Sequence, residues 1–256
     1  MARRRSKRHS PKREDFMLKE QIKTPQGIFN TKTMVYLSKF FNKGIISRLG
    51  YRIARGKEAD IYIAEPGSSE VVAGKEHVIL KFFRVDASSF FNMSDYIKGD
   101  PRFERQAGRG KAGIINTWCK KEFGNLMLAE AAGVHAPKPY MFNGNILAME
   151  FLGGKDTIFP TLNDAELEKP EKALDELLVA AKRLYKRGLI HADLSEYNIL
   201  MNDDVPFIID WGQAVSAKHP RAAEFLRKDI FNLLKFFRRR YGLETDLDAT
   251  LREITE

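Results

Sequence analysis

The alternation of apolar and polar residues predicts a sheet in the first half of the chain. Two strands are expected between Tyr51 and Glu65, on either side of a turn at Gly56. Val78–Phe83 predicts a short apolar strand that contains a single lysine, and Ile146–Leu152 predicts a further apolar strand. A Gly-Gly pair follows this last strand, which is typical of a hinge. The first half therefore predicts strands that end at a flexible joint.

Helical spacing of apolar residues defines a second set of elements, most of them later in the chain. Four helices are predicted, at Thr31–Asn42, Cys119–Ala132, Pro170–Arg187 and Pro220–Tyr241. In residues 84–118 the apolar positions show neither helical nor strand periodicity, and the segment is rich in Gly, Ser, Arg and Asp. This predicts a flexible loop or a functional lid.

These elements together predict an α+β fold with two lobes and a cleft where the lobes join. We expect a basic tail and a helical extension over 1–48. A strand-rich N-lobe with the flexible loop follows over 49–152, and a short helical C-lobe over 153–256.

Composition narrows the class of protein without naming a function. Hydrophobic residues make up 43% of the chain, which suffices for a core. No apolar run is long enough to span a membrane, and the basic start lacks the apolar stretch of a secretory signal. The single cysteine, Cys119, permits neither an internal disulfide nor a cysteine zinc site. These features predict a cytoplasmic protein with no membrane partner.

The net charge of +9 is unevenly distributed. The first 23 residues hold nine Lys or Arg against three acidic residues, a pattern that attracts phosphate backbones or forms a solvated tail. A second cluster, Arg238–Arg240, lies at the end of a predicted helix, where cations also favour the helix dipole.

The residues with the clearest chemistry lie between His191 and Asp210. His191–Asn198 precedes an apolar run, and a second apolar run ends in Asp210. This is the kinase spacing H-x-D-L-x-x-x-N followed by a strand that ends in Asp. Phosphoryl transfer needs a carboxylate to orient a hydroxyl, here Asp193, and oxygen ligands for magnesium, here Asn198 and Asp210. We expect His191 to orient the loop rather than to react.

The upstream half is expected to supply a phosphate cradle and a lysine. The stretch Gly56-Lys57-Glu58-Ala59 lies where a glycine-rich loop would lie, although a plain β-turn explains it equally well. Lys81 lies inside an apolar strand, where an unpaired ammonium is costly. Glu122 on the next helix is the expected partner, and Glu130 is the competitor.

With these residues in view, the chain resembles the RIO family of atypical protein kinases, in the type-one branch that lacks an N-terminal winged-helix domain. The resemblance rests on Gly56–Ala59, His191–Asn198 and Ile209-Asp210-Trp211, and it extends from about Ile22 to the C-terminus. It implies a protein-kinase-like fold that uses ATP with Mg²⁺ or Mn²⁺.

The resemblance also implies roles for individual residues. Lys81 and Glu122 would anchor the triphosphate, and the hinge segment Met149-Glu150-Phe151-Leu152 would hold the adenine through backbone contacts of Glu150 and Leu152. Asp193 would be the catalytic base. Asn198 and Asp210 would bind the metal ion, and Asp210 would also accept a phosphoryl group as an aspartyl phosphate.

Further implications concern substrates and partners. The segment 84–118 matches the flexible loop of the family, so the serines in it become candidate autophosphorylation sites: Ser88, Ser89 and Ser94. The family acts in small ribosomal subunit maturation, and the basic tail and Arg238–Arg240 suit a partner rich in rRNA.

The chain departs from ordinary protein kinases in its C-lobe. Ala192 stands where most kinases have an arginine that reads a phosphorylated loop, and the part after Asp210 has room for one main helix and no Ala-Pro-Glu. A peptide-docking lobe is thus largely missing, which favours autophosphorylation or ATP hydrolysis over phosphorylation of other proteins. Two alternatives stay open: a small-molecule phosphotransferase of the aminoglycoside or choline kinase type, and a non-catalytic ribosome-assembly module.

Overall fold

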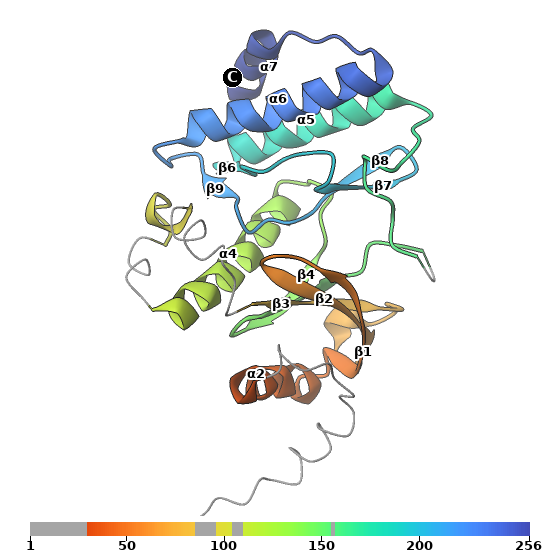
Figure 1. The fold of residues 1–256 in the computed structure, drawn as a ribbon, viewed down its shortest axis with the longest axis vertical. Coiled ribbons are helices and arrows are strands. Elements are labelled where there is room, and N and C mark those ends of the chain that lie inside the picture. The colour runs from red at the N-terminus through yellow and green to blue at the C-terminus, as the bar shows by residue number, and fades with distance from the viewer. Residues whose placement is uncertain (1–29, 85–95, 104–109, 155–156) are drawn as a thin grey trace, which may run out of the picture.

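The N-lobe is built on a five-stranded antiparallel sheet. The computed structural model describes residues 30–84, 96–103, 110–154 and 157–256, which form two lobes along the long axis of the molecule (Figure 1). The strand order is β1-β2-β3-β5-β4. The strands are β1 (Ile46–Arg55), β2 (Ala59–Pro66), β3 (Val78–Phe83), β4 (Pro139–Asn143) and β5 (Ile146–Glu150). A short 3₁₀ turn, η1 (Glu70–Val72), lies between β2 and β3.

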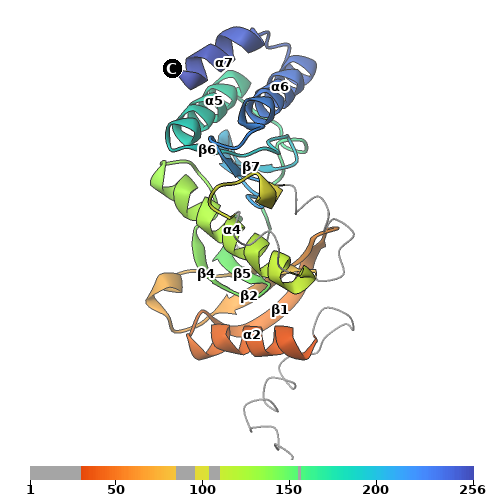
Figure 2. The ribbon, with the colours of Figure 1, turned by 90° about the vertical axis from the view of Figure 1, so that its left-hand side faces the viewer.

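Helices cover both faces of this sheet, which explains why β3 is buried at every position. On one side, α2 (Thr31–Asn42) packs Leu37 and Phe40 into a core shared with the strands. On the other side, α4 (Lys111–Ala131) crosses the sheet and separates it from the C-lobe (Figure 2). The predicted helix at Thr31–Asn42 and the strand at Val78–Phe83 are confirmed at both ends.

The prediction for the segment before α4 was wrong in part. Residues 111–118 belong to α4, although the sequence pattern assigned them to a loop and began the helix at Cys119. Gly110 and Gly113 obscured the pattern, yet Ile114 and Trp118 are buried against the C-lobe core. These apolar contacts outweigh the low helix propensity of glycine.

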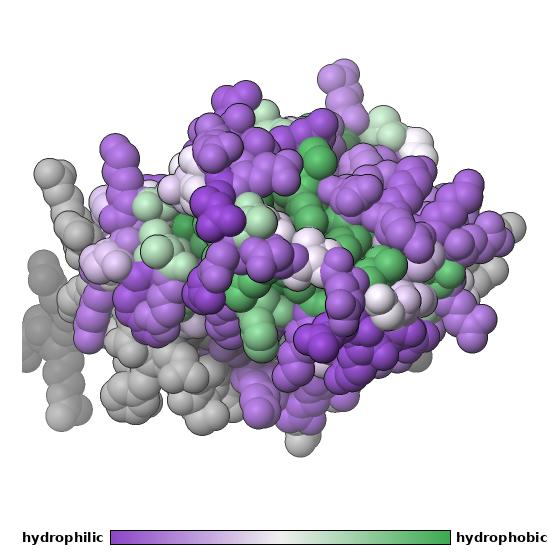
Figure 3. Space-filling model, turned by 90° about the horizontal axis from the view of Figure 1, so that it is seen from above, coloured by the Kyte–Doolittle hydropathy of each residue, from purple (hydrophilic) through white to green (hydrophobic). Residues whose placement is uncertain are grey.

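In the described residues, the C-lobe consists of three helices and two short pairs of antiparallel strands. Seen from its free end, charged and polar side chains surround a narrower apolar strip (Figure 3). The helices are α5 (Pro170–Lys186), α6 (Ala222–Tyr241) and α7 (Leu247–Thr255). The strand pairs are β6 (Leu189–Ile190) with β9 (Val215–Ser216), and the hairpin of β7 (Ile199–Asn202) with β8 (Val205–Ile208).

The helix α7 corrects the expectation of a single main helix after Asp210. Asp246 caps it by accepting a hydrogen bond from the amide of Ala249, and Ile254 is buried against the core. In the described part of the chain, no helix is both long and apolar enough to cross a bilayer.

Candidate active site

A cleft of about 580 Å³ lies between the lobes, within the size range of small-molecule sites. Of the thirteen residues that the sequence assigned to catalysis and to nucleotide or metal binding, twelve line it: Gly56, Lys57, Glu58, Ala59, Lys81, Glu122, Met149, Glu150, Phe151, Leu152, Asn198 and Asp210. The thirteenth, Asp193, lies beside the cleft, in contact with the lining residues Asn198 and Gln213.

Lys81 is buried and forms ion pairs with a buried carboxylate, Glu122, and with a half-exposed one, Asp210. Its Nζ lies 2.8 and 2.9 Å from the two carboxylate oxygens of Glu122 and 2.9 Å from Oδ1 of Asp210. Burial by itself would lower the pKa of the Lys81 ammonium, but Asp210 and Glu122 outweigh it, so the pKa is raised. The same ammonium lowers the pKa of the Asp210 carboxyl group. Glu130, the alternative partner, lies 3.9 Å from Lys138 instead.

The turn between β1 and β2 forms one wall of the cleft. The amide of Gly56 donates a 2.8 Å hydrogen bond to the carbonyl oxygen of Ala59, which closes the turn. A Cβ at position 56 would lie 3.2 Å from that oxygen, so glycine gives the turn room to close. The next two residues, Lys57 and Glu58, also line the cleft.

The segment after β5 forms the opposite edge of the cleft. The amide of Glu150 donates to the carbonyl oxygen of Lys138, and the carbonyl oxygen of Leu152 accepts from Phe159. The Glu150 carboxylate is also engaged, since it lies 2.6 Å from Nζ of Lys75. Among the described residues, the amide of Leu152 has no backbone acceptor, and Leu152 lines the cleft, so this amide is available to a ligand.

Asp193 lies in the loop between β6 and β7, where its two carboxylate oxygens have different surroundings. Oδ2 accepts from the amide groups of Asn198 at 3.2 Å and Gln213 at 3.3 Å. Oδ1 lies 3.4 Å from Nζ of Lys228. Partial burial raises the pKa of Asp193, and the charge of Lys228 opposes this shift. The side chain is about one-third exposed, so it is accessible to a substrate.

A buried carboxylate on α6 anchors this loop. The oxygens of Asp229 accept hydrogen bonds of 2.7 and 2.8 Å from the amides of Ala192 and Leu194, on either side of Asp193. Ala192 has a φ of +67°, a left-handed conformation that costs an L-residue about 1–2 kcal/mol. The two bonds offset this strain and fix the direction of the Asp193 side chain.

His191 supports the same loop without facing the cleft. Its Nε2 lies 3.1 Å from the carbonyl oxygen of Ile209, and its ring packs edge-on against Trp211. Burial lowers the pKa of His191 to about 4, so the ring is neutral near pH 7 and donates to that oxygen. The geometry agrees with an orienting role.

The loop that carries Asp210 is held from α4 by two buried polar side chains. Nζ of Lys121 donates to the carbonyl oxygens of Gly212 and Ala214 at 2.8 and 2.6 Å. Asn125 donates to the carbonyl oxygens of Trp211 and Ala214 at 2.8 and 3.0 Å. Burial lowers the pKa of Lys121 to about 7. Asp210 itself has a φ of +62°, so the loop is strained at the residue that faces Lys81.

Asn198 and Asp210 present oxygen atoms that suit a magnesium site. Both side-chain hydrogen bonds of Asn198 use its amide nitrogen Nδ2, which leaves the side-chain oxygen Oδ1 without a donor among the described residues. The lowered pKa keeps the Asp210 carboxylate ionised. Across the part of the chain that the structure describes, no three His, Cys, Asp or Glu side chains lie close enough together to hold a metal ion by themselves. One Asp and one Asn suit Mg²⁺, which keeps waters and phosphate oxygens in its coordination sphere.

The basic cluster Arg238–Arg240 is engaged within the fold. Arg238 lies 3.6 Å from Glu244 and Arg239 lies 3.4 Å from Glu196. Arg240 donates to the carbonyl oxygens of residues 163 and 165. A contact with rRNA would therefore compete with these internal bonds. The basic tail and the candidate serines Ser88, Ser89 and Ser94 lie outside the described residues.

Sequence reasoning missed several residues around the site. They are Lys121, Asn125, Gln213, Lys228 and Asp229, all polar residues that reach the catalytic or metal-binding loop. The one available signal was the position of Asp229 on the otherwise apolar face of its helix, where an unpaired carboxylate would be costly.

Known proteins match this chain in sequence and in fold. Residues 60–250 match the family profile described as RIO domain. The RIO-type serine/threonine-protein kinase Rio1 of Haloferax volcanii is 39% identical over 236 residues, which cover 92% of this chain and 79% of the relative. The Rio1 kinase of Thermoplasma acidophilum is 42% identical over 69% of this chain and 92% of its own length. Human RIO1 is 32% identical over 84% of this chain and 38% of its own length.

Solved structures give the same fold. The Rio2 kinase from Chaetomium thermophilum aligns with a TM-score of 0.68 at 23% identity, covering 91% of this chain and 71% of that one. The ADP/Mg²⁺-phosphoaspartate complex of that kinase aligns at 0.66 with 24% identity, covering 88% and 66%. The predicted two-lobed kinase fold is thereby confirmed. The matches also favour a protein kinase over both alternatives that the sequence left open. The chain belongs to the RIO family, as a RIO-type serine/threonine protein kinase.

Proposed function

We propose that the kinase transfers the γ-phosphoryl group of ATP in this cleft, with Asp193 as base, Lys81 and Glu122 as the triphosphate anchor, and Asn198 and Asp210 as metal ligands. The observation that carries the proposal is the pairing of the buried Lys81 with the buried Glu122 and with Asp210, whose side chain is half exposed. It fixes an ammonium where the α- and β-phosphates would lie and aims a second carboxylate at the same space.

In the transfer step, the acceptor hydroxyl donates its proton to Asp193 as its oxygen attacks the γ-phosphorus. The new O–P bond forms as the bond from the γ-phosphorus to the β,γ-bridging oxygen breaks, and ADP leaves. The pKa of Asp193 is raised toward neutral pH, which suits a base that must accept a proton and then release it. Asp229 and Asn198 hold the carboxylate in place during the step.

Magnesium, or manganese in its place, would supply charge neutralisation for the phosphates when bound by Asn198 and Asp210. At the other end of the nucleotide, the free amide of Leu152 would donate to the adenine ring. Gly56–Ala59 would lie over the phosphates, as their position on the cleft wall suggests.

The substrate side of the proposal rests on the family. We expect autophosphorylation at Ser88, Ser89 or Ser94. A second route would form an aspartyl phosphate at Asp210. A carboxylate oxygen attacks the γ-phosphorus, the bond to the β,γ-bridging oxygen breaks so that ADP leaves, and water later hydrolyses the aspartyl phosphate to release free phosphate. One relative has a structure described as a phosphoaspartate complex, which supports this second route. Cytoplasmic action on the pre-ribosomal small subunit and its rRNA completes the proposal.

Incubation with Mg²⁺ and γ-labelled ATP tests the chemistry. The protein-bound label is separated from free phosphate, and acid-stable label is separated from acid-labile label. Asp193→Ala is expected to abolish turnover and keep ATP binding, whereas Lys81→Ala weakens both. Label retained on serine through acid supports protein phosphorylation. Free phosphate with an acid-labile label on Asp210 supports the aspartyl-phosphate route. If both variants turn ATP over at the parental rate, the proposed site is wrong.

A further inference from the structure

Lys228 is the cation that directly faces the proposed base. It lies on α6, and its Nζ is 3.4 Å from Oδ1 of Asp193. The other contacts of that carboxylate are neutral amide groups, from Asn198 and Gln213, and both go to Oδ2. Among the described residues, Lys228 is therefore the one basic side chain in contact with Asp193, and it approaches the oxygen that the amides leave open.

The exposure of Lys228 argues against a purely structural role. Its side chain is about half exposed, and a half-exposed ion pair adds little to stability. Two other residues of α6 hold the catalytic loop in place. Asp229 accepts from the loop backbone, and Asn232 donates to the carbonyl oxygen of Leu194 at 3.2 Å. The loop would keep its position without the lysine.

The basic residues that line the cleft all belong to the N-lobe. Lys81 is buried and bound to two carboxylates, where the α- and β-phosphates are expected, and Arg55 and Lys57 lie at the turn between β1 and β2. The phosphoryl group in transit must pass next to Asp193, because the acceptor hydroxyl binds there. Charge on its three outer oxygens needs a donor at that point. Lys228 is placed to be that donor.

We infer that Lys228 is a catalytic residue whose ammonium contacts the phosphoryl group while it moves from ADP to the acceptor oxygen. The inference rests on the proposed function, since it takes Asp193 as the base. Lys228 stays protonated throughout: the acceptor proton goes to Asp193, the bond to the β,γ-bridging oxygen breaks, and ADP carries away the electron pair. The lysine stabilises the charge that is spread over the three outer oxygens of the phosphoryl group during the transfer.

The test compares Lys228→Met, Lys228→Arg and the matched control Lys235→Met. Lys235 is an exposed lysine of the same helix, and it lies over the ring of Phe231. Three quantities are measured for each variant: kcat and KM for ATP, the affinity for ADP with Mg²⁺, and the affinity for ADP with Mg²⁺ and aluminium fluoride. The last complex mimics the phosphoryl group in transit, so it reports on the contact without turnover.

Loss of a donor in an enclosed site lowers kcat by about 100- to 1,000-fold, and the partial exposure of Lys228 reduces this expectation to about 10- to 100-fold. We expect Lys228→Met to lower kcat and the aluminium fluoride affinity by similar factors, with KM and ADP affinity within about twofold of the parent. Lys228→Arg should recover part of both losses, and Lys235→Met should match the parent.

Two results would overturn the inference. One is parental kcat in Lys228→Met, and the other is an equal loss of affinity for ADP with and without aluminium fluoride. Asp193→Ala, measured in parallel, distinguishes a failure of the role inferred for Lys228 from a failure of the proposed function. If it abolishes turnover while Lys228→Met does not lower it, the proposed function stands and the lysine is not catalytic. If Asp193→Ala also turns over normally, the proposed function fails first.

Discussion

Replacing Asp229 by Asn tests how the catalytic loop is held in place. The carboxylate accepts two short hydrogen bonds from the backbone, at 2.7 and 2.8 Å, and both donors are buried. Asparagine has nearly the same shape but only one acceptor oxygen. Its amide group would face a backbone N–H, so a donor would meet a donor. One amide beside Asp193 would then lose its partner.

The size of the effect follows from these bonds. Burial raises the pKa of Asp229 to about 7, so the carboxyl group is partly ionised near neutral pH. A hydrogen bond contributes about 0.5–1.5 kcal/mol with a neutral partner and about 1.5–3 kcal/mol with a charged one, and a buried amide left unsatisfied costs about 1–3 kcal/mol. The left-handed strain at Ala192 is then no longer fully offset. We expect Asp229→Asn to lower the free energy of unfolding by about 2–4 kcal/mol, a large share of the roughly 5–15 kcal/mol of a typical domain. A shift of about 1 Å in Asp193 would lower turnover by about 100-fold.

Urea unfolding and ATP turnover measure the two parts of this expectation. Turnover is measured at low temperature, after circular dichroism has shown that the variant is folded. Asp175→Asn, an exposed aspartate of α5, serves as the matched control and should behave as the parent. An unfolding midpoint unchanged by Asp229→Asn, together with turnover within threefold of the parent, would refute the proposed anchoring.

Two further predictions concern the metal-binding loop and the basic tail. Lys121→Met removes two buried hydrogen bonds to the loop after Asp210, so we expect a weaker apparent affinity for Mg²⁺ at a fixed ATP concentration. Lys120→Met, on the exposed side of α4, is the control. Equal Mg²⁺ titrations in the two variants would contradict a role of Lys121 in holding the metal-binding loop. Removal of residues 1–19 should weaken RNA binding and reduce its dependence on salt without changing ATP turnover, and an unchanged salt slope would reject phosphate contacts by the tail.

The sequence predicted those parts of the molecule that are encoded locally. The strand at Val78–Phe83 and the helix at Thr31–Asn42 have clear periodicity, and the spacing from Asp193 to Asn198 is a property of one loop. The pairing of Lys81 with Glu122 was also within reach, because a lysine in a buried strand needs a carboxylate nearby. Short elements held by tertiary contacts were not predicted, such as β4 and α7.

The missed parts of the candidate site are those that the tertiary fold brings together. Lys228 and Asp229 lie about 35 residues after Asp193 in sequence, and only the packing of α6 against the catalytic loop places them beside it. Lys121 reaches a loop more than 90 residues away. A charged residue on a predicted helix has many possible partners, so sequence spacing alone cannot select among them.

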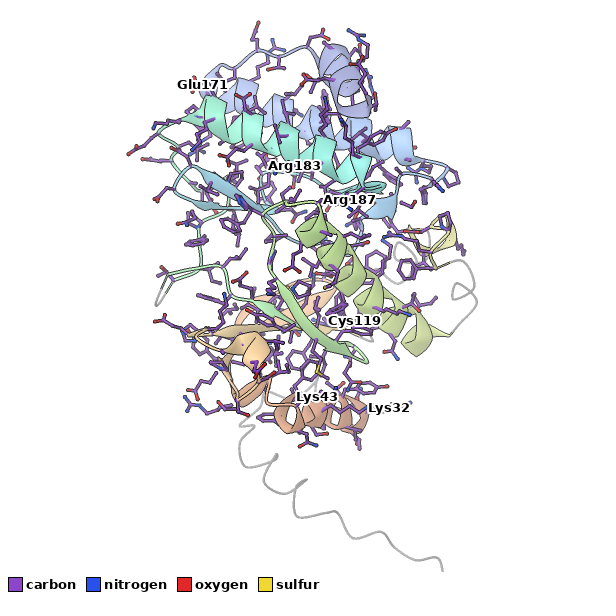
Figure 4. The ribbon with its side chains drawn as sticks, turned by 180° about the vertical axis from the view of Figure 1, so that it is seen from behind. Lys32, Lys43, Cys119, Glu171, Arg183 and Arg187 are labelled. Carbon is purple, nitrogen blue, oxygen red and sulfur yellow. The ribbon has the colours of Figure 1, made fainter. Side chains whose placement is uncertain are left out.

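The attachment of α4 to both lobes limits how the molecule can open. Toward the sheet, Glu122 holds Lys81 of β3. Toward the C-lobe, Lys121 holds the loop after Asp210, and Arg183 of α5 donates at 3.0 Å to the carbonyl oxygen of Gly133 at the end of α4 (Figure 4). Wide separation of the lobes would have to break either the buried bonds of Glu122 to Lys81 or the buried bonds of Lys121 to the loop after Asp210. Nucleotide exchange should then proceed through small movements at the rim of the cleft, in the turn at Gly56 and at the hinge. The helix α4 keeps the relative orientation of the two lobes fixed.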